Sequence, residues 1–322
     1  MFSVVIPLYN KAPYVAKAIQ SVATQTYQEF ELLVIDDGSK DGGFEIAKKL
    51  LDALTPPLGG WGATCQSNAG VSSTRNKAAK RAKYPYIAFL DADDWWEPTF
   101  LEEMKQLIEE FPEAGIYGSS YYKVKNGRSI PANIGVEAGF EKGYIDYCKV
   151  YAKTMWMPLW TGAVIVPKPV YEELDGFKPE LKLGEDFHLW IRIADKYKVA
   201  FLNKPLSNYN QDVDLANRAV GDQFYLPHEH MLFADYSLLK NQKNFQFLFQ
   251  KLAASGLLPY YLAKRNKAEV VKILSVMQWK HQPLKYRLYY QILPHDVVKC
   301  WFKALKMGAK LKRKLNKLRS CR

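Results

Sequence analysis

The feature that most constrains this chain is the regular alternation of short apolar runs with helical patterns over its first half. The run FSVVIPLY at 2–9 is rich in β-branched residues, and apolar side chains from Val15 to Val22 then recur at helical spacing. Similar runs, each followed by a helical pattern or by polar turn residues, cover 30–37, 61–66, 86–94 and 115–124. Continuous apolar strands that alternate with helices predict an α/β fold, with a mostly parallel nucleotide-binding sheet and helices on both faces.

Polar residues follow four of the expected strands at the point where each strand ends. In open α/β sheets, ligands bind in the crevice beyond the carboxyl ends of the strands. The topology would bring the four groups to one edge, which predicts a single ligand site there. The groups are Pro7-Leu8-Tyr9-Asn10, Asp36-Asp37-Gly38-Ser39, Asn68-Ala69-Gly70 and Asp91-Ala92-Asp93-Asp94.

Asp91 and Asp93 are two carboxylates that lie just past a buried strand. Hard cations such as Mg²⁺ and Mn²⁺ prefer oxygen ligands of this kind and usually share them with substrate phosphates. The alternative is that these acids cap the helix that Pro98 opens. Glu97 would be the more natural cap, so the alternative leaves the pair unexplained.

The other acids and Arg75 each have two interpretations. Asp36 or Asp37 forms a turn, or accepts hydrogen bonds from a nucleobase or ribose. Arg75, within a helix expected over 71–82, is a surface arginine or a clamp for a phosphate or base.

A Glu-Asp pair begins a later helical pattern. Glu185 and Asp186 follow Gly184 and are helix caps or a general base for an acceptor hydroxyl. His188, in the same turn, is a helix-surface histidine or a ligand to metal or phosphate.

Together these segments resemble the family 2 glycosyltransferases, which have the nucleotide-sugar-binding type A fold. The matching stretches occur in the family's order and spacing, and they cover roughly residues 2–210. They are SVVIPLYNKAPYVAKAIQSVATQTYQEFELLVIDDGSKD, NAGVSSTRNKAAKRAKYPYIAFLDADDWWEP and DGFKPELKLGEDFHLWIRIA.

The resemblance implies a role for each matching residue. Asp93, with Asp91 and His188, would hold a divalent metal, Mn²⁺ or Mg²⁺, that bridges the diphosphate. Asp186 matches the catalytic base, and Glu185 is its neighbour in the pair. The nucleotide site would be formed by Pro7, Tyr9, Asn10, Asp36, Asp37, Asn68, Gly70, Arg75, Asp91 and Ala92.

The implied reaction is a single inverting displacement, in which an acceptor hydroxyl attacks the sugar of a nucleotide-diphosphate sugar. The resemblance favours a UDP-sugar as donor and a saccharide or lipid-linked saccharide as acceptor, in the assembly of bacterial surface polysaccharide. Thr74 stands where the family often has Ala, which is a small departure. No Gln/Arg-x-x-Arg-Trp segment of the processive synthases follows the Glu-Asp pair, which favours transfer of one sugar. A non-catalytic nucleotide-binding module tethered to a membrane is the alternative.

The charge of the chain is uneven. Residues 225–322 carry 20 Lys and Arg against 4 Asp and Glu, and residues 1–224 carry 25 against 29. This asymmetry predicts two parts, a catalytic domain over 1–215 and a basic, aromatic-rich helical region over 216–322.

The last segment, 296–322, combines an apolar stripe (Val297, Trp301, Ala304, Gly308, Leu311, Leu315, Leu318) with ten Lys or Arg from Lys299 onward. Its composition is typical of a helix on an anionic membrane surface, although a packed helix or an RNA-binding segment is also open. The chain shows no nucleic-acid-binding motif, no signal peptide and no apolar stretch long enough to span a bilayer. We therefore expect a cytoplasmic enzyme that is peripheral on the inner face of the cytoplasmic membrane and has no nucleic-acid partner.

Overall fold

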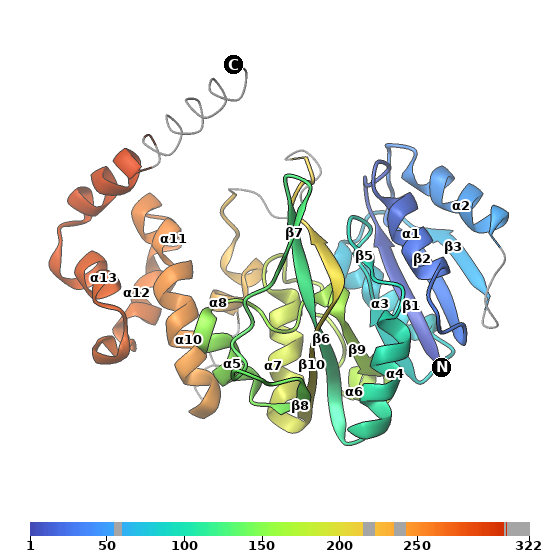
Figure 1. Cartoon of the computed structure of the whole chain (residues 1–322). Coiled ribbons are helices and arrows are strands. Elements are labelled where there is room, and N and C mark those ends of the chain that lie inside the picture. Colours follow the sequence, from blue (N-terminus) through green and yellow to red (C-terminus); the bar gives the residue numbers. More distant parts are fainter. Residues whose placement is uncertain (55–59, 215–222, 235–242, 306, 308–322) are drawn as a thin grey trace, which may run out of the picture. The chain divides into compact units, whose positions relative to one another are not determined.

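The computed structural model describes residues 1–54, 60–214, 223–234, 243–305 and 307 (Figure 1). Residue contacts divide the chain into two units, Met1–Leu248 and Phe249–Arg322. The predicted boundary between 215 and 216 lies outside the described residues. Each unit is described by itself below.

The N-terminal part of the sheet is parallel and built from the first four of the five runs that the sequence indicates. Its strands lie in the order β3-β2-β1-β4. The chain adds β2 and β3 on one side of β1 and then β4 on the other side. In the register, Phe2 pairs with Phe30 and with Tyr86. The strands are β1 (Phe2–Leu8), β2 (Phe30–Asp36), β3 (Trp61–Cys65) and β4 (Tyr86–Phe89).

The sheet continues past β4 in the order β9-β6-β10-β5, with β7 beside β6 and β8 beside β10. β6 and β10 are parallel to one another, whereas β9 is antiparallel to both β4 and β6. The prediction of a mostly parallel sheet is confirmed, with antiparallel strands added in this half. The strands are β5 (Trp95–Trp96), β6 (Ala114–Lys125), β7 (Arg128–Pro131), β8 (Lys142–Ile145), β9 (Val164–Pro167) and β10 (Lys198–Asn210).

Helices cover both faces of the sheet. Side chains alternate between the two faces of a strand, and Phe2, Val4, Ile6 and Leu8 of β1 share one core cluster with α1, α2 and α4. On the other face, α3 packs against β1 and β2, and α7 packs against β6 and β10. These helices are α1 (Val15–Ala23), α2 (Gly43–Ala53), α3 (Val71–Arg81), α4 (Phe100–Glu110) and α7 (Glu185–Lys196).

Further helices complete the first unit. They lie between β8 and β9, after β9, and beyond β10, and α10 extends into the second unit. They are α5 (Tyr147–Thr154), η1 (Thr161–Ala163), α6 (Lys168–Glu173), η3 (Pro227–Glu229), α8 (Met231–Ala234) and α10 (Lys243–Gly256).

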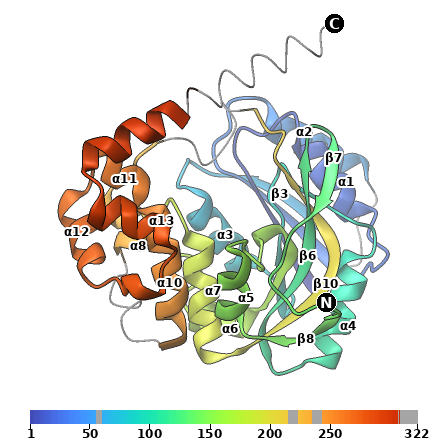
Figure 2. The same cartoon turned by 60° about the vertical axis from the view of Figure 1, so that its left-hand side comes forward.

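The second unit is helical over its described residues, as the sequence pattern indicates (Figure 2). None of the helices in the described ranges has the length and hydropathy that a bilayer crossing requires. The elements are α11 (Leu258–Ala263), α12 (Lys267–Ser275), η4 (Trp279–His281), α13 (Leu284–Arg287), the π-helical η5 (Leu288–Ile292) and a helix over 295–305.

The helix over 295–305 contains the first part of the predicted apolar stripe. Val297 is 51% exposed and Trp301 59% exposed, whereas Val298 is buried. The stripe residues from Gly308 onward lie outside the described residues.

Candidate functional site

The loop after β1 is fastened to the loop after β2 by hydrogen bonds. Asn10 has a left-handed backbone with φ +49°. Its backbone N–H donates to Ser39 Oγ, 2.9 Å away, and its Oδ1 accepts from the Lys40 N–H at 2.9 Å. The N–H of Ala12 donates to Asp41 Oδ2 at 2.8 Å. These bonds fix the turn that directs residue 11 toward the end of β4.

Of the residues predicted for the nucleoside pocket at this edge, Pro7 is buried within β1 and Tyr9 follows the strand. The Tyr9 side chain is 47% exposed. An exposed aromatic ring at a strand end offers a flat apolar surface to a planar base. The side chain of Asn10 is used in the loop contacts above.

Asp36 ends β2 and keeps one oxygen without a protein partner. Its Oδ2 accepts from the N–H groups of Gly38 and Ser39, each at 3.1 Å. Its Oδ1 is buried and has no hydrogen-bond partner among the described residues. A buried carboxylate oxygen without a donor is costly, and it fits a site at which a ligand N–H or O–H would supply that donor.

Both oxygens of the Asp37 carboxylate accept hydrogen bonds from the protein. Its Oδ1 accepts from Gln66 Nε2 at 2.8 Å and from the Ala69 N–H at 2.9 Å. Its Oδ2 accepts from the Gly70 N–H at 2.8 Å. Asp37 therefore shapes the loop before α3, in which Asn68 is exposed and Gly70 has φ +87°.

Arg75 of α3 is a buried cation that joins two parts of the site. It is only 3% exposed, which excludes the surface-arginine interpretation. Its Nη2 donates to Asp91 Oδ1 at 2.6 Å, and its Nη1 donates to Glu185 Oε1 at 3.4 Å. The guanidinium also lies over the ring of Phe177. Burial would lower the pKa of Arg75, but the charges of Asp91 and Glu185 hold that pKa above its ordinary value.

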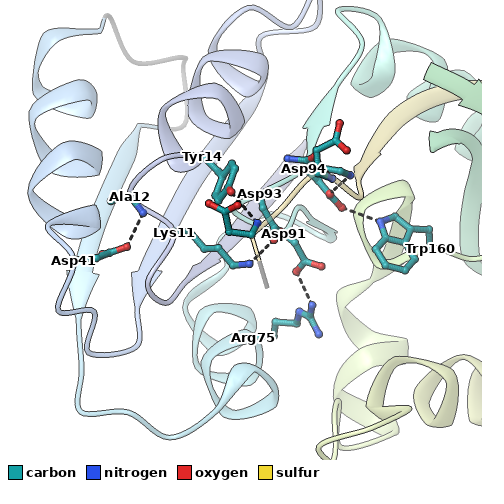
Figure 3. Close-up of polar contacts among 12 residues, drawn as sticks. Lys11, Ala12, Tyr14, Asp41, Arg75, Asp91, Asp93, Asp94 and Trp160 are labelled. Carbon is teal, nitrogen blue, oxygen red and sulfur yellow. Dashed lines mark hydrogen bonds and ion pairs between the residues drawn. The ribbon is translucent and has the colours of Figure 1, made fainter. Parts of the chain in front are cut away.

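The acids after β4 point in different directions (Figure 3). Asp91 pairs with Arg75, and Asp93 forms an ion pair with Lys11. Burial and the charge of Asp91 raise the pKa of Asp93, and Lys11 partly offsets them. Ala92, between the two acids, is buried.

Asp94 is a buried anchor that the sequence did not single out. Its Oδ2 accepts from Trp160 Nε1 at 2.9 Å, and its Oδ1 accepts from the Asn210 N–H at 2.8 Å. Burial and the nearby acids hold the pKa of Asp94 well above its ordinary value. The interpretation of these acids as helix caps is wrong, since the N-cap of α4 is Thr99 and Glu97 accepts instead from Asn208.

The Glu-Asp pair begins α7 directly after Gly184, whose φ is +81°. Asp186 accepts from Thr161 Oγ1 at 3.2 Å and from the Phe187 N–H at 2.6 Å. Burial raises the pKa of Asp186. Burial and the charge of Asp186 raise the pKa of Glu185 to about 7, against the opposing charge of Arg75. Neither acid caps the helix through its side chain, so a capping role does not explain the pair.

His188 lies on α7 and is buried, so it is not a helix-surface residue. Among the described residues, no three His, Cys, Asp or Glu side chains form a metal-binding group. Asp91 and Asp93 nevertheless fit a divalent cation, because they are hard oxygen ligands at the ligand-binding edge. A cation that shares its coordination with phosphate and water needs only one or two carboxylates.

The structure thus brings Asp91, Asp93, Arg75, Glu185 and Asp186 to one edge, where the charge of Asp91 acts on the pKa of each of the other four. Lys11 also belongs to this edge and was missed from the sequence, which placed Asp94 at the edge but gave it no role of its own. For Lys11, its place next to the Tyr9-Asn10 turn was the available signal.

The chain matches the family model described as Glycosyl transferase family 2 over residues 3–162. An uncharacterised glycosyltransferase of Rickettsia felis is 34% identical over 210 residues, which is 64% of this chain and 32% of that protein. The chain thus spans about a third of the length of that relative. The Escherichia coli UDP-Glc:alpha-D-GlcNAc-diphosphoundecaprenol beta-1,3-glucosyltransferase WfaP is 27% identical over 203 residues, covering 61% of this chain and 71% of that one.

Solved structures show the same fold. Residues 1–349 of Staphylococcus aureus TarS, in complex with UDP-GlcNAc, superpose with a TM-score of 0.69 at 20% identity, covering 95% of this chain and 92% of that one. The mannosyltransferase PcManGT of Pyrobaculum calidifontis, in complex with GDP-Man and Mn²⁺, superposes with a TM-score of 0.55 at 15% identity, covering 95% and 80%. With its type A fold and this family match, the chain belongs to the family 2 glycosyltransferases.

Proposed function

We propose that this protein transfers a single sugar from a nucleotide-diphosphate sugar to an acceptor hydroxyl, with inversion at the anomeric carbon. The observation that carries the proposal is the position of Arg75, which contacts Asp91 at the donor edge and Glu185 beside the base. One buried guanidinium would thereby fix the distance between the acids that bind the donor and the Glu-Asp pair that contains the base.

The donor would bind at the carboxyl ends of β1, β2 and β4. The buried Oδ1 of Asp36 has no donor in the protein and would accept from the base, while the exposed ring of Tyr9 would pack on it. Asn68 and Gly70, on the loop that Asp37 shapes, would complete the nucleoside pocket. A UDP-sugar is the donor that we propose, and TarS, which shares the fold, has been solved with UDP-GlcNAc.

Asp93 and Asp91 would hold a divalent cation, Mn²⁺ or Mg²⁺, against the diphosphate. The cation would offset negative charge on the departing nucleoside diphosphate. The solved structure of PcManGT contains Mn²⁺ with GDP-Man, which supports the assignment. His188, which is buried in the first turn of α7, is the third ligand that we propose for the cation.

Asp186 would accept the proton of the acceptor hydroxyl. Thr161 and the Phe187 N–H orient its carboxylate, and burial raises its pKa toward the range that suits a general base. Glu185, with a pKa of about 7, would adjust the charge around Arg75 as it titrates. The nucleophile would be the acceptor oxygen itself, so one displacement inverts the configuration.

The acceptor that we propose is a saccharide, free or lipid-linked, in bacterial surface-polysaccharide assembly. The name of the related WfaP includes a diphosphoundecaprenol-linked sugar. An acceptor of that kind would place the enzyme at the inner face of the cytoplasmic membrane. The exposed Trp301 and Val297, together with the lysines of 296–322, would contact anionic lipid there.

The test is a panel of nucleotide sugars with Mn²⁺, read first by thermal shift and then by nucleotide release with candidate acceptors. A donor at 100 times its Kd should raise the free energy of unfolding by about 2.7 kcal/mol. Metal-dependent transfer or donor hydrolysis would support the enzyme. Tight binding with neither reaction would favour the alternative, a non-catalytic nucleotide-binding module tethered to membrane.

A further inference from the structure

Lys11 pairs with Asp93, one of the two acids that we propose as ligands of a divalent cation. It extends from the loop after β1 to Asp93, 82 positions later in the chain, and forms an ion pair with it (Figure 3). The side chains of Lys11 and Asp93 are only 12% and 19% exposed. This loop is held by the bonds from Asn10 and Ala12 to the β2–α2 loop, so the backbone position of Lys11 is well defined.

The carboxylates at this edge outnumber the cations that pair with them. The connected carboxylates are those of Asp91, Asp93, Glu185 and Asp186, and the cations paired with them are Lys11 and Arg75. With all four acids ionised, the set carries a net charge of −2. A nucleoside diphosphate would be repelled by such a site, because like charges at short range disfavour one another. A divalent cation would remove the excess.

The two cations of the site differ in the elements that carry them and in the shape of their side chains. Arg75 is buried in α3 and is fixed by Asp91, by Glu185 and by the face of Phe177. Lys11 is on a loop and carries its charge at the end of a flexible four-carbon chain. Lys11 is therefore the cation that can change partners without disturbing a helix.

We propose that Lys11 and the divalent cation are alternative partners of Asp93, and that Lys11 transfers to the donor diphosphate when the metal binds. The inference rests on the proposed function. In the free protein, the metal must displace Lys11 from Asp93. When the diphosphate is present, the displaced ammonium gains a new anionic partner. Lys11 thus makes binding of metal and nucleotide mutually dependent, by the same factor from either side.

The experiment measures binding, with MnCl₂ and UDP as probes, by isothermal titration of the full chain. Lys11→Met removes the competing charge, so Mn²⁺ without nucleotide should bind at least tenfold more tightly than to the wild type. The factor by which Mn²⁺ improves UDP affinity should fall at least fivefold. Lys40→Met is the matched control, because it removes one exposed positive charge from the neighbouring loop. Both quantities should stay within twofold in that variant.

Each result has a definite meaning. Unchanged or weaker Mn²⁺ affinity in Lys11→Met overturns the exchange, as does an equal change in Lys40→Met. If the wild type shows no Mn²⁺-dependent UDP binding while Lys11→Met does bind Mn²⁺ more tightly, the proposed function fails and the competition stands. Lys11→Gln repeats the test if circular dichroism finds the methionine variant unfolded.

Discussion

The hydroxyl of Thr161 donates a 3.2 Å hydrogen bond to Oδ2 of Asp186. Thr161 comes from the turn before β9, directly after Trp160, whose indole is held by Asp94. The acids after β4 and the Glu-Asp pair of α7 are therefore linked through residues 160 and 161 as well as through Arg75. Since each carboxylate oxygen has two lone pairs, Asp186 keeps acceptor capacity for a substrate hydroxyl.

Replacing Asp186 with Asn keeps the shape of the side chain and removes the proton acceptor. We expect kcat to fall by ~10²–10⁴-fold while UDP affinity changes less than twofold. Steady-state kinetics with the best donor, together with UDP titration, would measure both quantities. Thr161→Val, which removes one donor to the carboxylate, should shift the acidic limb of the kcat profile to higher pH. Full turnover in Asp186→Asn would transfer the role of base to Glu185.

The raised pKa of Glu185 predicts a pH-dependent stability. Because the folded-state pKa of about 7 lies above the ordinary value of 4.5, the folded state binds more protons than the unfolded state between these values. The stability from this group is complete below pH 4.5 and is lost as pH rises to about 7.

Relative to the wild type, Glu185→Gln should therefore gain ~1–3 kcal/mol of stability between pH 4 and pH 8, on top of the loss of the Arg75 contact at both pH values. Chemical denaturation at both pH values would measure the free energy of unfolding. Glu172→Gln, an exposed acid on α6, is the control. A gain that is equal at pH 4 and pH 8 would disprove the shifted pKa.

Asp93→Asn should abolish the effect of divalent cations on UDP binding, because it removes the anionic ligand and keeps the volume. We expect UDP affinity in the presence of Mn²⁺ to drop to the value measured with EDTA. Titration calorimetry with and without metal gives the comparison. Asp52→Asn, which changes an exposed acid on α2, should leave the Mn²⁺ effect intact. Retention of that effect in Asp93→Asn would contradict the ligand assignment.

Asn76 of α3 fixes the turn that supports Arg75. Its Nδ2 donates to the Phe177 carbonyl at 2.7 Å, and its Oδ1 accepts from the Phe177 N–H at 3.0 Å and from the Tyr171 hydroxyl at 2.5 Å. Asn76→Ala should lower the free energy of unfolding by ~2–4 kcal/mol, because three partners lose their bonds. Urea denaturation would measure the loss, with the exposed Lys80→Ala as control. A loss below that of Lys80→Ala would show that the turn does not depend on Asn76.

The basic segment 296–322 should bind anionic lipid. Each Lys or Arg near such a surface contributes about 1 kcal/mol, and Trp301 adds apolar burial. We expect co-sedimentation with vesicles that contain phosphatidylglycerol, weakened by salt, and loss of binding on deletion of 296–322. Trp301→Ser should weaken the binding that survives high salt, whereas Lys40→Met should not. Full-length protein in the supernatant at low salt would refute the membrane contact.

Local patterns of continuous apolar runs predicted the strands β1 to β4 and β6 and a mostly parallel sheet, and the resemblance of three motif stretches predicted the type A fold and the family. Their resemblance to the family placed Asp91, Arg75 and Asp186 in one site; in the structure Arg75 contacts Asp91, and the charges of Arg75 and Asp91 act on the pKa of Asp186. The sequence could not assign Asp37 to the loop before α3 or pair Lys11 with Asp93. Those contacts join residues far apart in the chain, and their geometry depends on how the loops close.

Local sequence patterns also could not predict the antiparallel strands in the second half of the sheet. β9 has only four residues, and it runs antiparallel to β4. The 3-10 helix η1, which leads into β9, also contacts β4. Likewise, the burial of His188 follows from the packing of α7 on β6 and β10. A helical period shows which residues share a face, but it does not show what covers that face.

The contacts of Arg75 have a consequence for how such chains vary in evolution. A buried guanidinium that has lost Asp91 or Glu185 would be left with uncompensated charge, and breaking a buried pair costs about 3–5 kcal/mol. A substitution that removes the charge at one of these positions should therefore favour a second substitution that restores the charge balance at another. In diverging descendants, Arg75, Asp91 and Glu185 should be inherited as a unit, and chains that lose transferase activity should lose all three together.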